Sequence, residues 1–270
     1  MSDKIMIKGP VRRVFQTLIF MVTVPIAVFY CIKAYPQTIN ISTMAFAPAG
    51  YLGEDRKPMG MAYEMANGIA TNAGLDFTNS LKPYPRVLLD LESGDADIAL
   101  LYINNHLEKS TVKVASIFTD SNIIIGKAGL DITSLEDLYG LKVGILRKAS
   151  YSKSFDSNTN ITKVRVKNYR QSIRMLLKGR IDALIGGTII VNYELRKLGH
   201  DQDVLGTPFV ISRTPVWLLV SKKNKDRTLK EKLRNSVISL KKIGFFTKTA
   251  QKYIGKTSSL IFDDSHSHGR

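Results

Sequence analysis

The sequence predicts an α/β fold of two lobes, each with a mostly parallel sheet flanked by helices. The first observation is a pattern that occurs twice, at residues 88–101 and 175–187. Each copy reads as the end of an amphipathic helix, a glycine suited to a left-handed helix end, two residues, an aspartate and a short apolar run. The second is that neither run carries a charge, as in parallel strands buried on both faces. Two copies indicate two lobes, each with its own sheet, and a cleft between lobes is a natural ligand site.

Composition limits the classes of protein that remain. A chain of 270 residues has room for one large or two modest domains. The net charge of +16 could favour nucleic acid, an anionic membrane surface or an anionic ligand. The basic residues are dispersed without interleaved aromatic residues, so we predict a solvated basic surface and no nucleic-acid partner. The one cysteine, Cys31, lies in an N-terminal apolar stretch, so no disulfide framework or cysteine-based metal site is predicted.

Residues 1–34 are predicted to be a signal peptide or an N-terminal membrane anchor. A basic segment, 1–13, precedes residues 14–32, a run of 19 residues without a charge. That length exceeds a usual signal core and only just spans a bilayer, so both interpretations stay open. Ala34 would end a passable cleavage site. The positive-inside rule places the rest of the chain outside the cytoplasm, in the periplasm, either free or anchored to the inner membrane by residues 14–32.

From residue 38 the sequence alternates between strand and helix patterns. Apolar or small residues at helical spacing predict a helix over 61–73, closed by Gly74. Prolines at 83 and 85 precede a second helix over 86–93. Residues 47–51 are predicted to be a loop and 55–58 a turn. The predicted strands of this half are 38–46, 76–80, 97–102, 112–119 and 121–127.

A second unit follows, with a short capped helix near residues 132–138. Its predicted strands are 142–146, 163–166 and 182–185. Three helices are predicted in this unit: one that begins near residue 151, one over 169–178 and one over 189–198. A last apolar strand at 216–221 precedes two amphipathic helices at 229–243 and 246–253. Residues 263–270 are predicted to be disordered.

The order of these pieces resembles a type II periplasmic solute-binding protein, specifically the amino-acid-binding proteins of ABC importers (bacterial extracellular solute-binding family 3). The resemblance covers about residues 37–255. It is carried, in the family's order, by residues 51–60 with Glu64, 88–101, 134–145 and 229–255. It implies one lobe from residues 37–121 with 215–255 and a second from 122–214. The remaining residues, 256–270, are predicted to be a flexible tail. Two hinge strands would cross between the lobes, which close around ligand, and Pro215 fits a hinge boundary.

The resemblance also implies two charged ligand contacts that this sequence changes. The family's arginine, which pairs bidentately with the ligand carboxylate, falls on Lys109, 12 residues after Asp97. A surface lysine with no ligand role is the alternative reading of Lys109. The family's acid, which holds the ligand ammonium, falls on Gly187, five residues after Asp182. These departures disfavour a standard α-amino acid and favour an anionic or uncharged ligand.

Further positions match binding roles in the resembling family or suit an anion. The positions implied by the resemblance are Tyr51, Tyr102 and Asn104. Ala149 and Ser150 lie at a helix start, where free amides favour an anion, although Ser150 could simply cap the helix. Arg86 lies at another helix start, where a cation is unfavourable, so it could serve as a substitute anion clamp. Asp97 and Asp182 could suggest a carboxylate pair, but their twin placement before strands favours a structural role.

The sequence therefore predicts an exported, monomeric solute-binding protein that closes on a small polar ligand, anionic or amino-acid-like, for an ABC-type importer. No catalytic triad, metal-ligand spacing or phosphate-binding loop is recognisable, so neither covalent chemistry nor a cofactor is predicted. One alternative is a membrane-anchored periplasmic sensor or accessory module that signals through another protein. Another is a dehydratase-like enzyme on the same scaffold, for which Glu108 is the one tempting acid or base.

Overall fold

The computed structural model describes residues 38–256, apart from residues 104, 148 and 150 and the side chains of residues 105 and 106. The predictions for residues 1–34, for Asn104 and Ser150, and for the tail beyond residue 256 lie outside the described residues. Within the described ranges, no helix is both long and apolar enough to cross a membrane.

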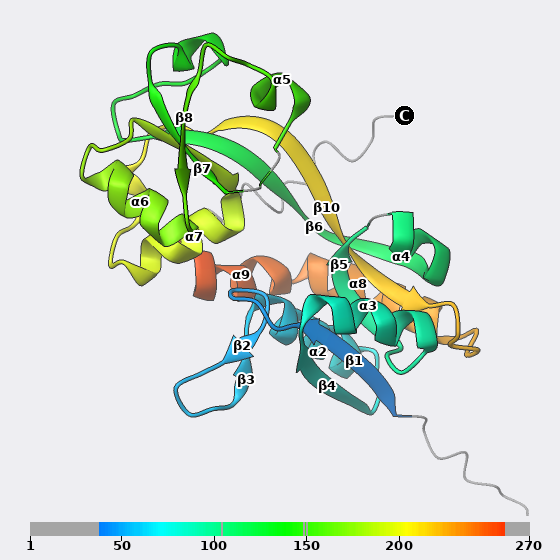
Figure 1. Ribbon diagram of the computed structural model, residues 1–270. Helices are drawn as coiled ribbons and strands as arrows, with labels where there is room; N and C mark the ends of the chain where they lie inside the picture. Colours follow the sequence, from blue (N-terminus) through cyan, green and yellow to red (C-terminus); the bar gives the residue numbers. More distant parts are fainter. Residues whose placement is uncertain (1–37, 104, 148, 150, 257–270) are drawn as a thin grey trace, which may run out of the picture. The chain divides into compact units, whose positions relative to one another are not determined.

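A mixed sheet of eight strands runs through the described part of the chain, in the order β4-β1-β5-β10-β6-β9-β7-β8 (Figure 1). Strands β4, β1 and β5 are parallel to one another, and so are β9, β7 and β8. A small antiparallel hairpin, β2 with β3, stands apart from this sheet. The strands are β1 Ile39–Met44, β2 Tyr51–Leu52, β3 Pro58–Met59, β4 Phe77–Lys82, β5 Ile98–Tyr102, β6 Thr111–Gly126, β7 Lys142–Leu146, β8 Thr162–Val166, β9 Ala183–Gly187 and β10 Phe209–Ser221.

Two long strands, β6 and β10, join the two parallel groups (Figure 1). They pair with each other antiparallel, while β10 also pairs with β5 and β6 also pairs with β9. The expectation of one separate sheet in each lobe is therefore wrong, because these strands make the hydrogen-bonded ladder continuous. The segments predicted at 112–119 and 121–127 form one strand, in which Asp120 pairs with Thr214. The strand predicted at 216–221 begins earlier, at Phe209, and includes Pro215, which pairs with Thr119. The hydrogen bonds between β6 and β10 satisfy the backbone N–H and C=O groups of this polar stretch. The apolar pattern alone does not reveal that the strands continue through it.

Helices cover the sheet at the positions that the apolar periodicity predicts. Every helix predicted at 61–73, 86–93, 169–178, 189–198, 229–243 and 246–253 is confirmed, with small shifts at the ends. The helices are α2 Met61–Asn72, α3 Tyr84–Ser93, α4 Asn105–Ser110, α5 Lys153–Asp156, α6 Tyr169–Leu177, α7 Thr188–Lys197, α8 Leu229–Lys242 and α9 Phe245–Ile254. Single 3-10 turns lie at Glu136–Leu138 and Gln202–Val204.

The largest buried cluster joins α2, α8 and α9 to strands β1, β5, β6 and β10. Ile189 and Tyr193 of α7 belong to the same cluster, while Val191 and Leu195 of α7 belong to a second cluster with residues of α6 and β9. Helix α7 is thus held from both halves of the sheet. Its first turn is hydrogen-bonded to Asp120 and Ser121, in the middle of β6.

The repeated pattern has the same structure in both copies. Asp97 precedes β5 and exchanges two hydrogen bonds with Asn40 of β1: its Oδ2 accepts from the Asn40 N–H at 2.8 Å, and its own N–H donates to the Asn40 carbonyl at 2.8 Å. Asp182 precedes β9 and makes the same pair with Lys142 of β7, at 2.8 and 2.9 Å. The glycines that end the preceding helices are left-handed, with φ 91° at Gly94 and 66° at Gly179. The aspartates are structural links between neighbouring strands.

Candidate ligand-binding site

The carboxyl ends of parallel strands surround a small cavity. β1 ends at Met44, β5 at Tyr102 and β9 at Gly187, from which α7 begins directly. Ligands of α/β proteins commonly bind beyond the carboxyl ends of parallel strands and at helix N-termini. The cavity has a volume of about 180 Å³. It is lined by Met44, Phe46, Pro48, Ala49, Met61, Ala62, Leu100, Leu101, Tyr102, Phe118, Asp120, Ile189, Ile190 and Val216.

Tyr102 and Asp120 supply the side-chain polar groups of this otherwise apolar lining. The Tyr102 hydroxyl donates to Asp120 Oδ2 at 3.0 Å. Asp120 Oδ1 accepts from the backbone N–H of Ser121 at 2.9 Å and of Ile189 at 3.3 Å. Asp120 therefore connects the end of β5 to the first turn of α7.

Burial changes the acidity of both groups. The Tyr102 side chain is partly exposed, but desolvation of its hydroxyl end raises the pKa of the phenol, and the neighbouring Asp120 carboxylate raises it further, so the phenol remains a hydrogen-bond donor at neutral pH. Burial also raises the pKa of Asp120, against the lowering effect of the hydrogen bonds from Tyr102, Ile189 and Ser121. The site thus contains a carboxylate in surroundings that disfavour its charge.

Gly187 lies directly beside this carboxylate. A Cβ built on Gly187 would lie 3.0 Å from Asp120 Oδ2. On the other side, the phenol of Tyr169 interacts with the backbone of Gly187 and with Tyr151. The Tyr151 hydroxyl accepts from the Leu146 N–H at 3.1 Å. Of the predicted site residues, the structure thus brings Tyr102 and Gly187 together through Asp120.

Tyr51 lies in a different aromatic cluster. Its ring centroid is 6.2 Å from that of Tyr193 in α7 and 6.4 Å from that of Tyr253 in α9. The Tyr253 hydroxyl donates to Glu64 and accepts from the Gly60 N–H at 3.1 Å. Tyr51 is half-buried and does not line the cavity. Its predicted place over the ligand stays a prediction.

Arg86, Lys109 and Ala149 also lie outside the lining of the cavity. Arg86 Nε is 2.7 Å from Oδ1 of the buried Asp90. Lys109 is exposed, and its carbonyl accepts from Lys222 Nζ at 3.0 Å. Ala149 is exposed in the turn after β7. The structure does not bring these three together with Tyr102, and their binding roles stay predictions.

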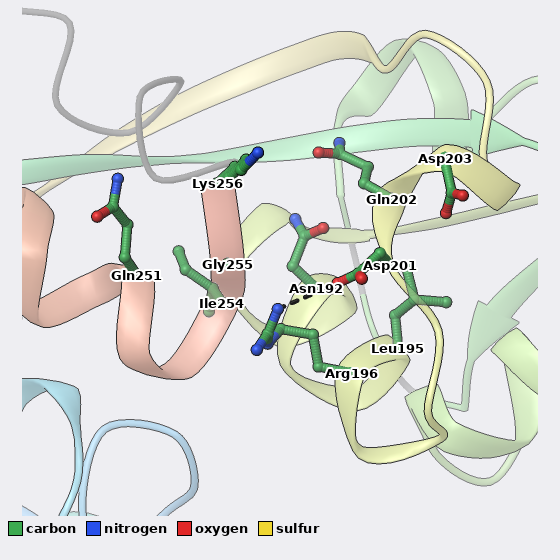
Figure 2. A pocket seen from close by; sticks show the side chains of 10 residues that line it. All are labelled: Asn192, Leu195, Arg196, Asp201, Gln202, Asp203, Gln251, Ile254, Gly255 and Lys256. Atoms are coloured by element: carbon green, nitrogen blue, oxygen red, sulfur yellow. Dashed lines mark hydrogen bonds and ion pairs between the residues drawn. The ribbon is translucent and has the colours of Figure 1, made fainter.

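A larger cavity, of about 610 Å³, lies between α7, the turn at Gln202–Val204 and the end of α9 (Figure 2). Figure 2 shows Arg196 directed toward Asp201, and the two form an ion pair at 3.1 Å. The lining is largely polar and contains none of the predicted site residues. Within the described residues, no three His, Cys, Asp or Glu side chains gather as a metal site. The smaller cavity is therefore the better candidate.

Asp120 and Tyr169 are not among the site residues predicted from the sequence. A signal for Asp120 was present, because it is the charged residue that interrupts the extended segments 112–119 and 121–127. Its hydrogen-bond partner Ile189 is 69 residues away, and no local pattern links them. Tyr169 follows the capping Asn168 at the start of α6 and looked like an ordinary helix residue.

Comparison with known proteins places the chain in a family. The family model of the bacterial extracellular solute-binding proteins, family 3, matches residues 39–256. The probable amino-acid-binding protein YxeM of Bacillus subtilis is 21% identical over 209 residues, covering 75% of this chain and 78% of the relative. The ABC transporter arginine-binding protein 1 of Escherichia coli is 24% identical over 224 residues, covering 80% and 90%.

Solved structures share the fold. The unliganded, open L-cystine solute receptor of Neisseria gonorrhoeae has a TM-score of 0.69 at 18% identity, covering 81% of this chain and 93% of that one. The second substrate-binding domain of Lactococcus lactis GlnP, also open, has a TM-score of 0.66 at 20% identity, covering 80% and 94%. These likenesses confirm the two-lobed α/β fold. The chain belongs to the bacterial extracellular solute-binding proteins of family 3, which are binding proteins and not enzymes.

Proposed function

We propose that this protein is exported, binds one small solute in the cavity beside Tyr102, closes its two lobes on it and delivers it to an ABC-type importer. The cavity carries the proposal, because it combines strand ends with the first turn of α7 and a largely apolar lining. Family membership supports the binding role.

The lobes of this proposal are residues 37–121 with 215–255, and residues 122–214. The pairing of the strands supports this division: β10 meets β5 from Val216 onward, while β6 meets β9 from Asn122 onward. Between these contacts β6 and β10 pair mainly with each other, and Asp120 lies in this crossing. The crossing is where a hinge would bend.

The lining of the cavity favours a small solute with a largely apolar body and at least one hydrogen-bonding group. Its volume of about 180 Å³ is below the roughly 300–1,000 Å³ of drug-sized ligand sites. Among its described lining residues there is no lysine, arginine or histidine to neutralise an anion. An amino-acid-like or neutral solute therefore fits better than the anionic ligand that the sequence suggested.

Thermal unfolding against amino acids, amines, organic acids, sugars and polyamines tests the binding role. A true ligand at a hundredfold excess over its Kd should stabilise the folded protein by about 2.7 kcal/mol. Tyr102→Ala should abolish this shift. Tyr139→Ala is the matched control: Tyr139 is about as exposed as Tyr102, at 43% against 41%, but lies outside the cavity, so its variant should retain the shift. A ligand shift that survives Tyr102→Ala would place the site elsewhere.

We further propose that the protein acts as a monomer in the periplasm, with residues 14–32 holding it to the membrane if they are not removed. The uncharged run of 19 residues supports the membrane anchor, because it is just long enough to span a bilayer. Mass spectrometry of the protein from a membrane fraction would decide. Retention of these residues favours the alternative of an anchored sensor or accessory module, and a mass that begins at residue 35 contradicts anchoring by this segment.

A further inference from the structure

We propose that the lobe of residues 122–214 carries a cationic groove along α6 that binds the headgroups of anionic phospholipids and holds this lobe against a membrane. The inference goes beyond the proposed function: it uses the proposed place of the protein beside a membrane, but no property of the ligand cavity. The groove has a volume of about 490 Å³ and shares no lining residue with that cavity. It is lined by Lys167, Asn168, Arg170, Gln171, Arg174, Met175, Lys178 and Arg180.

The helix itself gathers the cations of the groove. Arg170, Arg174 and Lys178 follow one another at intervals of four residues, and this spacing places them on one side of α6 and its C-terminal end. Lys167 lies before the helix and Arg180 after it. Arg170 is half-buried, and the other four are exposed. The cations therefore extend along the whole length of α6.

This arrangement costs the helix stability. Like charges four residues apart on a helix repel each other, and such pairs are formed here by Arg170 with Arg174 and by Arg174 with Lys178. The first turn of α6 contains no acid, although the helix dipole favours one there. The fold of the helix thus does not explain the cations, and their charge is available to a partner.

Little negative charge of the protein itself lies against these cations. Arg170 pairs with Glu194 of α7, Nε to Oε2 at 2.8 Å. Among the described residues no acid forms an ion pair with the other four, and none lines the groove. At the C-terminal end of α6, a Cβ built on Gly179 would lie 4.0 Å from Lys127 Nζ, so a further cation adjoins this end of the groove. An anionic partner would therefore meet concentrated positive charge.

The composition of the groove favours a lipid surface over an acidic protein. The centres of protein–protein interfaces are enriched in aromatic residues and depleted of lysine. The described lining of the groove contains no aromatic residue, and Met175 is its one apolar member. Attraction of clustered lysines and arginines to anionic headgroups needs no apolar anchor and raises the affinity about fivefold for each cation near the surface. Charge complementarity therefore points to anionic phospholipid.

Vesicle flotation of the full chain tests the inference. Residues 14–32 can attach to any bilayer, so the readout is the excess of binding to vesicles with about one third phosphatidylglycerol over binding to vesicles of phosphatidylcholine alone. We expect this excess to disappear in about 0.5 M salt, which screens exposed charges. Arg174→Gln with Lys178→Gln should lower the excess about 25-fold, because two cations of the groove are removed.

Lys225→Gln with Arg227→Gln is the matched control. Both residues are exposed in the loop between β10 and α8, outside the groove, and their replacement removes the same charge. We expect this pair to lower the excess by less than about threefold, since salt screens charges that lie away from the bound surface. The groove variant should unfold at the temperature of the unmodified protein or above it, because it relieves the repulsion along α6.

The outcomes separate the inference from the proposed function. An equal loss in both double variants would reduce the effect to net charge and overturn the inference, as would binding without preference for phosphatidylglycerol. Displacement from anionic vesicles by poly-L-glutamate, at a charge concentration below that of the lipid, would make an acidic protein the better partner and also overturn it. Stabilisation by a solute in the thermal panel should be the same in the groove variant, so the proposed function is tested independently.

Discussion

Asp90 of α3 shows how a charged side chain is accommodated in the core of this protein. Its side chain is fully buried, with Lys82 Nζ 2.5 Å from Oδ2 and Arg86 Nε 2.7 Å from Oδ1. The Ser42 hydroxyl also donates to Oδ2, at 3.2 Å. Burial raises the pKa of Asp90, but the hydrogen bond and charge of Lys82, with Arg86 and Ser42, outweigh it and hold this pKa below its ordinary value. Arg86 therefore has a structural partner.

This ionisation predicts a dependence of stability on pH. Because the folded pKa of Asp90 is lower than the unfolded value of about 3.9, its contribution is present above that value and is lost as pH falls through the folded pKa. Urea unfolding between pH 2.5 and 7 would measure this loss. In Asp90→Asn the free energy of unfolding should be lower at neutral pH and should fall less steeply below about pH 4. An identical acid limb in both proteins would contradict the prediction.

Arg86→Ala separates the structural role of Arg86 from its predicted role as an anion clamp. We expect the free energy of unfolding to fall by about 1–3 kcal/mol, because one of the two ion pairs of buried Asp90 is lost while that with Lys82 remains. Ligand affinity, measured by calorimetry, should stay the same, since Arg86 does not line the cavity. A large loss of affinity with stability unchanged would instead support the clamp.

At the scale of elements, the loop after β1 caps the start of α2. The Pro48 carbonyl accepts from the Met61 N–H at 2.7 Å, and the Ala49 carbonyl accepts from the Ala62 N–H at 2.9 Å. These bonds satisfy amides that the first turn of a helix leaves free. All four residues line the cavity, and Met61 directly follows Gly60, the residue before the first turn of α2. The loop thereby fixes one wall of the candidate site.

Gly60 permits this close packing, and its replacement should be costly. Its φ is 134°, and an added Cβ would lie 2.5 Å from the Ala49 carbonyl oxygen. Gly60→Ala should lower the free energy of unfolding by about 3 kcal/mol or more, because both backbone strain and a backbone collision follow. Gly74→Ala is the matched control: its φ is 66° with nothing within 4 Å, so only about 1–2 kcal/mol should be lost. Equal losses in denaturant unfolding would contradict this account.

At the scale of the whole protein, β6 and β10 are the strands shared by both halves of the sheet. Their register shifts between Val210 and Ser212 and between Val216 and Trp217, on either side of the crossing. Irregular pairing bends strands and increases local twist. The side chain of Asn122 donates to Ser212 Oγ at 3.0 Å across this pair. These features suit a crossing that bends while its backbone remains paired.

Closure predicts a change of distance between the lobes. Spin labels on cysteines at Asp95 and Asn158, with Cys31→Ser, would report it by pulsed electron resonance. Saturating ligand should shorten and narrow the distribution of distances. The same labels in the Tyr102→Ala protein should show no change at that ligand concentration. An unaltered distribution with a ligand that binds tightly would contradict closure of the lobes.

Local patterns along the chain were enough to predict the alternation of strands and helices, the repeated helix–glycine–aspartate–strand pattern and the resemblance to a binding-protein family. These depend on local signals: apolar period, glycine at positive φ, and an aspartate before a strand. The contacts of Asp120 with Tyr102, 18 residues away, and with the first turn of α7, 69 residues away, became visible only in the folded chain. The same holds for the ion pair of Arg86 with buried Asp90 and for the continuation of β6 and β10 through both halves of the sheet. Long-range pairing brings these groups together, and no local periodicity records which distant strands become neighbours.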